Sequence, residues 1–252
     1  MIASVAWYIG WTLAAAGVLF TMRPWRVVGI PTRRRALFVL VAGLALAATA
    51  VIHIPAPTRA PTAAATLLDP WLPEYHFSEA HQTAVHASRE QTYRAILDVT
   101  PDEIALFRTL TWIRRLGRSS NAGILNPSHG VSILQTALES GFHILAEKPN
   151  EEIVLGTFVA APRSVHGRDW TPADFLAVDR PGFVKATMNF RLETSEAELT
   201  RVFTETRVYA TDAATARAFT LYWRTIYPGS SLIRSMWLRA IKRKAETRRS
   251  PD

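Results

Sequence analysis

The sequence has no cysteine at all, and it has no acidic residue over the first quarter of its length. Without cysteine the chain can form no disulfide, no thiolate zinc site and no cysteine nucleophile. The absence of cysteine does not indicate the cellular compartment. All 21 acidic residues lie at Asp69 or beyond. No glycine-rich phosphate loop and no internal repeat is present, so neither a phosphate-cradling loop nor a repeat architecture is indicated.

Two long segments lack charge of either sign, residues 2–22 and residues 36–54. A helix needs about 20 apolar residues to cross a ~30 Å hydrocarbon core, and both segments reach that length. The alternative for each is a buried helix of a soluble core, but two adjacent segments of this length favour membrane spans. A cleaved signal peptide fits poorly, because no Lys or Arg precedes the first segment.

The link between these segments, residues 23–35, carries five arginines and no acid. Positively charged loops stay in the cytoplasm, so we predict a two-pass protein of the cell membrane with a cytoplasmic link and an extracytoplasmic C-terminal part. The C-terminal end of the chain favours the opposite orientation in the membrane. Residues 232–252 carry seven Lys and Arg against two acids, and such a tail is attracted to anionic lipid of the inner leaflet.

The composition therefore predicts four parts. Residues 1–54 are a two-helix membrane anchor, 55–68 a proline- and alanine-rich linker, 69–246 a globular domain and 247–252 a basic tail. The basic excess of the domain lies in its last stretch, which leaves its body slightly acidic. We expect the lipid bilayer as a partner and no nucleic-acid face.

Within the globular part, an alternating strand pattern over 74–87 precedes two helical patterns. Ser88 and Thr100 are predicted to cap these helices, with Glu103 in the capping-box position of the second, over 100–118. A short helical segment follows over 132–141. Two hairpins are then predicted, turning at 148–151 and at 194–198. The chain closes on a long helical pattern over 213–247, in which Pro228 marks a kink or the start of a second helix.

Three segments carry a resemblance to a known superfamily: LPEYHFSEAHQTAVHAS (72–88), FTETRVYATDAATARAF (203–219) and YWRTIYPGSSLIRSMWLRAIKRKAE (222–246). Over about residues 69–246 the chain resembles the START-like, or SRPBCC, superfamily of polyketide cyclase/dehydrase and lipid-transport proteins. The resemblance implies an α+β helix-grip fold, in which a curved antiparallel sheet grips a long C-terminal helix around a cavity for apolar ligands. Its members bind, carry or transform hydrophobic molecules, and few share catalytic residues, so it assigns no catalytic residue and no cofactor here.

Three histidines, His76, His81 and His86, recur at intervals of five residues. In a strand, His76 and His86 share one face but lie about 33 Å apart at ~3.3 Å per residue, while His81 points to the other face. In a helix, successive histidines are about 140° apart. Neither geometry brings them to one ion, so no metal site is expected.

The same alternation places Glu79 and His81 on one face of the first strand. If that face lines the cavity, a carboxylate beside an imidazole can do acid–base work or orient a ligand hydroxyl. A structural hydrogen-bonded pair is the alternative, and the sequence favours it.

Further candidates for the cavity wall come from the last strand and the last helix. Arg207, paired with Glu205, could hold a ligand carboxylate or phosphate, although a pair that fixes the sheet to Glu79 or to the final helix is the favoured interpretation. The residues on that face of the strand are Phe203, Glu205, Arg207 and Tyr209, and those on the helix are Tyr222, Trp223 and Ile226.

Three functions stay open at this point. The first is membrane-anchored binding or transfer of a lipid or other hydrophobic molecule, driven by burial of its apolar body. The second is an enzyme of the cyclase/dehydrase kind acting on an apolar substrate. The third is a non-catalytic interaction or stress-response module whose cavity is filled by side chains. The sequence favours a function without catalysis.

Overall fold

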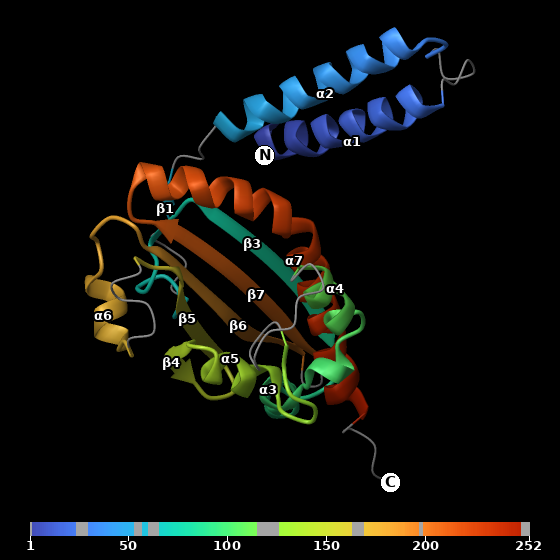
Figure 1. Cartoon of the computed structure of the whole chain (residues 1–252). Helices are drawn as coiled ribbons and strands as arrows, with labels where there is room; N and C mark the ends of the chain where they lie inside the picture. Colours follow the sequence, from blue (N-terminus) through green and yellow to red (C-terminus); the bar gives the residue numbers. More distant parts are fainter. Residues whose placement is uncertain are drawn as a thin grey trace. The chain divides into compact units, whose positions relative to one another are not determined.

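The structure is a computed structural model that describes residues 2–23, 30–52, 57–59, 66–114, 126–162, 169–196 and 199–247. The chain divides into two compact units. The first unit comprises residues 1–55 and 217–225, and the second comprises residues 56–216 and 226–252. Figure 1 shows the helices and strands that form each of them.

The first unit contains a pair of antiparallel helices, α1 (Ile2–Met22) and α2 (Arg33–Ile52), which lie side by side in Figure 1. Glycines bring their backbones together. A Cβ on Gly10 would lie 2.6 Å from the backbone nitrogen of Ala47, and a Cβ on Gly43 would lie 2.5 Å from that of Ala14. No larger residue fits at these positions, and close approach through small residues is a typical way for membrane helices to pair.

Large apolar side chains of the same two helices are exposed, including Trp11, Leu19, Leu37, Phe38 and Val41. Within the described residues, one helix has the length and apolar composition of a membrane span, at Val5–Met22. The sequence predicts two spans. The second helix begins with three arginines, and residues 53 and 54 of the predicted span lie outside the described residues. The structure thus supports one candidate span, not two.

The second unit is built on an antiparallel sheet of five strands in the order β3-β7-β6-β5-β4. The strands are β3 (Phe77–Val85), β4 (His143–Lys148), β5 (Glu152–Ala160), β6 (Val184–Glu196) and β7 (Leu199–Ala210). Both predicted hairpins, β4–β5 and β6–β7, are confirmed. The first turns at Asn150, whose φ of 63° is in the left-handed region that asparagine tolerates.

Short helices follow the first strand and join the hairpins: α3 (Arg89–Asp98), the 3-10 turn η2 (Pro101–Glu103), α4 (Phe107–Arg114), α5 (Ile133–Glu139) and α6 (Pro172–Ala177). Ser88 caps α3 as predicted, in a reciprocal capping box with Gln91. Glu103 accepts the backbone N–H of Thr100 at 2.8 Å. The single helix predicted over 100–118 is wrong, because Leu106 takes a φ of 57°, which an α-helix excludes, and divides η2 from α4.

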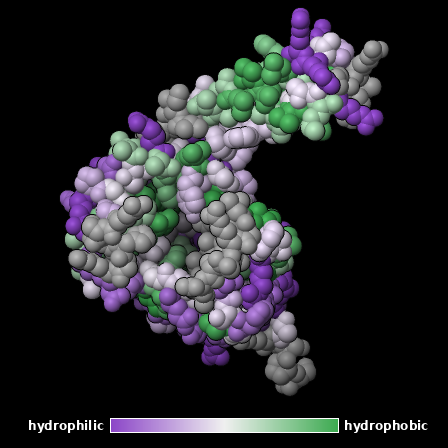
Figure 2. Space-filling view, in the orientation of Figure 1, coloured by the Kyte–Doolittle hydropathy of each residue, from purple (hydrophilic) through white to green (hydrophobic). Residues whose placement is uncertain are grey.

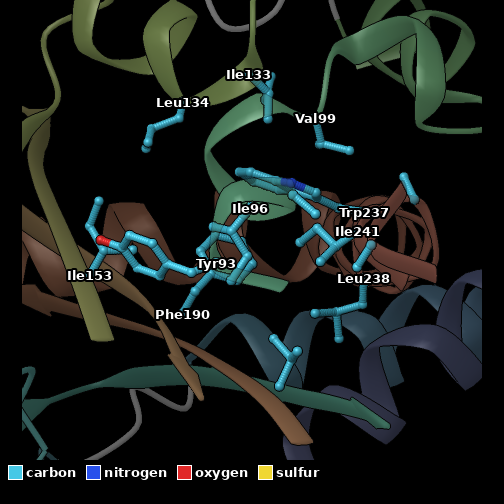
Figure 3. Packing of buried hydrophobic residues seen from close by; sticks show 14 of the residues in the cluster. Tyr93, Ile96, Val99, Ile133, Leu134, Ile153, Phe190, Trp237, Leu238 and Ile241 are labelled. Atoms are coloured by element: carbon cyan, nitrogen blue, oxygen red, sulfur yellow. The ribbon is translucent and has the colours of Figure 1, made fainter. Parts of the chain in front are cut away.

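One helix, α7 (Ala213–Thr247), closes the chain and continues through Pro228 without a break. In the second unit its C-terminal part packs on the concave face of the sheet. The Trp237 ring meets the Phe190 ring of β6 edge-on, with centroids 4.9 Å apart. The helices α3 and α5 contribute buried side chains to the same core (Figure 3), namely Tyr93, Ile96, Ile133 and Leu134. This α+β arrangement fits the helix-grip architecture that the resemblance implies.

The convex face of the sheet is covered as well. Leu68 and Phe175 are fully buried against Val154 and Leu145. Leu68 falls within the predicted linker, residues 55–68, so ordered packing begins earlier than the sequence indicates. In the same segment the short strand β1 (Thr58–Arg59) pairs with β2 (Glu74–Tyr75), while residues 53–56 and 60–65 lie outside the described residues.

The glycine contacts generate a test of the α1–α2 pair. Gly10→Leu would force its side chain into the backbone of α2, so we expect the helices to separate. Because the chain has no cysteine, cysteines introduced at Ala6 and Ala50, which lie in one small cluster, report the pairing by maleimide crosslinking. We expect the crosslink in the chain that carries only these two cysteines, and its loss when Gly10→Leu is added. Ile9→Leu, at an exposed position, is the control, and equal crosslinking in all three chains would contradict the packing.

Candidate functional site

A polar pair lies on the concave face of the edge strand β3. Alternation along the strand directs Glu79 and His81 toward α7, and their partners across the ladder in β7 are Thr206 and Thr204. The Nε2 atom of His81 lies 2.7 Å from the Oε1 atom of Glu79. The Glu79 side chain is 2% exposed and the His81 side chain 20% exposed. The carboxylate is therefore buried, and the imidazole reaches solvent.

Three serines of α7 surround this pair. The Ser230 hydroxyl donates to the second oxygen of Glu79 at 3.3 Å. The Ser235 Oγ atom lies 3.3 Å from Nδ1 of His81, and the Ser231 Oγ atom lies 3.4 Å from Nε2. Residues 231 and 235 are one helical turn apart, so they share a helix face. Both nitrogens of the ring thus meet a hydrogen-bonding group.

Arg234 lies on α7 among these serines and is partly buried. Its guanidinium donates to the Thr206 hydroxyl at 2.8 Å and contacts the Met188 sulfur at 3.8 Å. It also lies over the rings of Trp237, at 5.3 Å from the centroid, and Phe190, at 5.9 Å. Burial lowers the pKa of Arg234 below its ordinary value, and the nearby negative charge of Glu79 acts in the opposite direction.

Solvent reaches the space between this part of the sheet and α7. Thr206 is partly exposed although its strand, β7, has a neighbouring strand on either side. Solvent must therefore approach its side chain over the concave face. Figure 2 shows, without assigning residues to it, a hollow near the centre of the visible face of the second unit, with hydrophobic side chains inside. We call the space bounded by Glu79, His81, Thr206 and Arg234 the recess.

The hydrogen bonds around His81 define what the pair can do chemically. A carboxylate only accepts hydrogen bonds, so a neutral His81 places its proton on Nε2, toward Glu79. Its Nδ1 atom is then an acceptor and faces the Ser235 hydroxyl. The resulting chain of hydroxyl, imidazole and carboxylate can take a proton from Ser235 or from a ligand group at its place.

The candidates predicted on β7 lie on the opposite side of the sheet. Ladder partners on the two strands face the same way, so the partners of Glu79 and His81 fix the concave face of β7 as its even-numbered residues. The predicted residues, Phe203, Glu205, Arg207 and Tyr209, are odd-numbered and lie on the convex face. They cannot share the recess with Glu79 and His81, and grouping the two sets in one cavity is wrong.

On the convex face, Arg207 is the centre of a buried ionic network. Its guanidinium donates to Glu205 at 2.7 Å and to Asp69 at 2.7 Å. Next to it, Glu152 accepts from the Asn189 amide at 2.6 Å and from the backbone N–H of Leu67 at 2.9 Å. These contacts join the segment before β2 to the sheet. The Glu205–Arg207 pair is therefore a fixing element, but it joins the sheet to the segment before β2 and not, as predicted, to Glu79 or to the final helix.

The three aromatic and aliphatic candidates on α7 separate in a similar way. Tyr222 and Trp223 belong to the first unit, where their rings lie 5.3 Å and 6.2 Å from that of Phe219. Ile226 belongs to the second unit and is partly buried. Of the candidates predicted from sequence, the structure brings Glu79 and His81 together at the concave face, and Glu205 and Arg207 together at the convex face.

Arg234 and the three serines were not predicted from the sequence. The missed signal is helical spacing: positions 230, 234, 237 and 241 form one row on α7, and Trp237 and Ile241 are buried in the core. Polar residues that continue an apolar row must face the same sheet. The other two histidines do not join the site: His76 accepts the backbone N–H of Ala210 at 3.2 Å, and His86 follows the end of β3.

Comparison with known proteins adds little to this picture. No protein family and no curated protein matches the chain. Among solved structures, the Zhui aromatase/cyclase from Streptomyces sp. R1128 is 16% identical, with a TM-score of 0.29, over 69% of this chain and 96% of that one. A conserved protein from Geobacillus kaustophilus is 12% identical, with a TM-score of 0.36, over 68% and 96%. Hypothetical protein jhp0584 from Helicobacter pylori is 9% identical, with a TM-score of 0.37, over 75% and 99%. Likenesses with such low scores carry no argument.

The Arg207 network predicts a pH-dependent stability. Burial raises the pKa of Asp69, but hydrogen bonds from Thr66 and Arg207 outweigh it, and the pKa lies below its ordinary value. The carboxylate therefore stabilises the fold above the unfolded pKa of about 3.9, and this contribution is lost as the pH falls through the lower folded value. We expect Asp69→Asn to lower the free energy of unfolding at neutral pH by about 2 kcal/mol, since it leaves a buried charge with one partner fewer.

Urea unfolding followed by tryptophan fluorescence measures this difference. The gap between Asp69→Asn and the parent should narrow as the pH falls below about 4. Asp179→Asn, at an exposed position, is the matched control and should change little. A gap that stays constant from neutral to acidic pH would contradict the assigned role of the carboxylate.

Proposed function

We propose that the chain binds a hydrophobic small molecule in the recess between the concave face of the sheet and α7. The observation that carries the proposal is a polar set between the sheet and α7, in which His81 and Arg234 are partly exposed and Glu79 is buried, beside buried apolar side chains. A ligand gains affinity when its apolar body leaves water, and a few placed polar groups set its orientation.

The neighbourhood of the polar set supports this proposal. Met188 and Phe190 lie on the concave face and are buried, and Trp237 covers them from α7. His81, Thr206 and Arg234 face the same space yet remain partly exposed. If side chains filled the space, these groups would have no contact with solvent. Their exposure therefore counts against the third hypothesis, a module with a filled cavity.

We further propose that α1 and α2 anchor the chain in a cell membrane as a two-pass hairpin. Support comes from the outward-facing apolar side chains of both helices and from the glycine contacts between them. The arginine-rich link 23–35 favours a cytoplasmic link, which would place the second unit outside the cytoplasm. Anchoring would suit a carrier that takes its ligand from a bilayer.

Acid–base catalysis is a second candidate, favoured by one observation. The Ser235 hydroxyl, the His81 ring and the Glu79 carboxylate form a chain of hydrogen bonds with separations of 3.3 Å and 2.7 Å. Such an arrangement is able to activate a hydroxyl or to move a ligand proton. An enzyme of the cyclase/dehydrase kind would need a group of this type next to an apolar substrate.

Photolabelling tests the binding proposal. The full chain in neutral detergent is exposed to a long-chain acid and to its methyl ester, each carrying a diazirine, and the labelled peptides are mapped. We expect at least one probe to label peptides of β7 and of residues 226–247. Labelling confined to α1 and α2 would overturn the proposal.

A variant that fills the recess sharpens this test. Thr206→Phe places a ring in the space and should abolish the labelling of β7 and α7. Gln82→Phe places the same ring at an exposed position on β3, whose side chain points to the other face, and should leave the labelling intact. Equal labelling of both variants would count against the recess as the binding place, provided that both unfold at the parent temperature.

A fluorophosphonate probe tests the catalytic candidate. If His81 activates Ser235, the Oγ atom attacks phosphorus, fluoride leaves, and the hydroxyl proton passes to Nδ1 of His81. We expect mass spectrometry to find the adduct on Ser235 in the parent and to find none in His81→Gln. Ser140, a serine outside the recess, should be unlabelled in both chains. An unlabelled Ser235 in the parent would remove this candidate without touching the binding proposal.

A further inference from the structure

The contacts of Arg234 leave most of its donors without a strong acceptor. A guanidinium has five N–H donors. Among the described residues, those of Arg234 meet one hydroxyl, that of Thr206, and one thioether sulfur, a weak acceptor. No described carboxylate lies within 4.0 Å of it. The side chain thus keeps a positive charge in a partly buried place without a counter-ion at hand.

Arg207 on the other face of the same strands shows how this fold treats a structural arginine. It is almost fully buried, and two carboxylates, Asp69 and Glu205, each approach it to 2.7 Å. Burial of an ion is costly unless a partner of opposite charge compensates. Arg207 has such partners within the chain, whereas Arg234 has none among the described residues, and this contrast points to a partner from outside the chain.

The nearest negative charge, on Glu79, is already engaged. One of its oxygens meets His81 at 2.7 Å, and the other accepts from Ser230 at 3.3 Å. The guanidinium is held away from it by the Thr206 hydroxyl and by the rings of Phe190 and Trp237. Cation–π contacts of this kind fix the plane of a guanidinium while leaving its edge available to an acceptor.

We infer that Arg234 binds the anionic end of the ligand, a carboxylate or a phosphate, while the apolar body lies in the recess. This inference rests on the proposed function and names the class of ligand: an amphipathic molecule with one acidic group at its polar end. A planar guanidinium matches two oxygens of a carboxylate or phosphate at once. The guanidinium also contacts the Met188 sulfur and lies over the rings of Phe190 and Trp237, so its surroundings beyond the polar groups are apolar.

Photolabelling at neutral pH with matched probes tests this assignment on the full chain in neutral detergent. The probes are a diazirine-bearing long-chain acid, the corresponding alkyl phosphate and the methyl ester of the acid. Inorganic phosphate serves as a competitor that carries the charge without the chain. We expect the acid and the alkyl phosphate to label the recess at roughly a tenth of the concentration that the ester needs, as charge-assisted hydrogen bonds imply.

Three substitutions on α7 locate the effect. Arg234→Met, which keeps the length and removes the charge, should raise the half-saturating concentration of the acid about tenfold and leave that of the ester unchanged. Arg234→Lys should restore part of the preference, because it restores charge without the planar fork. Arg239→Met removes an exposed arginine from the same helix and should have no effect.

The outcomes separate this inference from the proposed function. If no probe labels the recess of the parent chain, the proposed function fails. If the acid and the ester label it equally, binding stands and the assignment of Arg234 is overturned, a result that needs no variant and holds even if Arg234→Met does not fold. Competition by inorganic phosphate alone at the concentration of the acid would show a bare anion site and would overturn the amphipathic class.

Discussion

The contact between Trp237 of α7 and Phe190 of β6 determines how the rest of the second unit is arranged. Two large rings packed edge-on at 4.9 Å in a buried core fix both the height of the helix above the sheet and its rotation. With Trp237 and Ile241 directed at the sheet, the 3.6-residue period directs positions 230 and 234 the same way. Arg234 and the serines therefore face Glu79 and His81 because apolar residues further along the helix have docked. The positions of these polar side chains thus depend on apolar packing further along the helix.

The sheet holds charged residues on both faces, and the two faces compensate them differently. On the convex face Arg207, Asp69 and Glu205 satisfy one another, and the network joins the segment before β2 to the strands. On the concave face Glu79 is satisfied by His81 and Ser230, while Arg234 has only a hydroxyl and aromatic rings. A fully satisfied network of buried polar groups rigidifies a fold. The same chemistry thus has a structural role on the convex side and, in our proposal, a ligand-binding role on the concave side.

Local patterns in the sequence predicted the elements well, and they predicted the site only in part. Alternation over β3, the Ser88 cap and the two hairpins all depend on neighbours within a few residues, and all are confirmed, although the strand predicted over 74–87 divides into β2 and β3. Alternation also grouped Glu79 with His81 correctly. It could not tell which face of β7 matches which face of β3, because that depends on the ladder register between strands more than a hundred residues apart. Arg207 was therefore kept as a candidate for the cavity wall, although a fixing pair was favoured, and Arg234, whose place depends on the rotation of α7, was missed.

The proposed membrane anchor and the proposed binding at the recess rest on separate residues, so their agreement is informative. The pairing of α1 and α2 depends on Gly10, Gly17 and Gly43 and on apolar side chains directed outward. The receptive character of the recess depends on Arg234, His81 and Thr206, none of which belongs to the first unit. A ligand with an apolar body and one acidic group partitions into a bilayer because the body leaves water while the acid stays at the surface. Two independent sets of residues, one suited to a membrane and one suited to an amphipathic anion, thus point toward the same class of molecule.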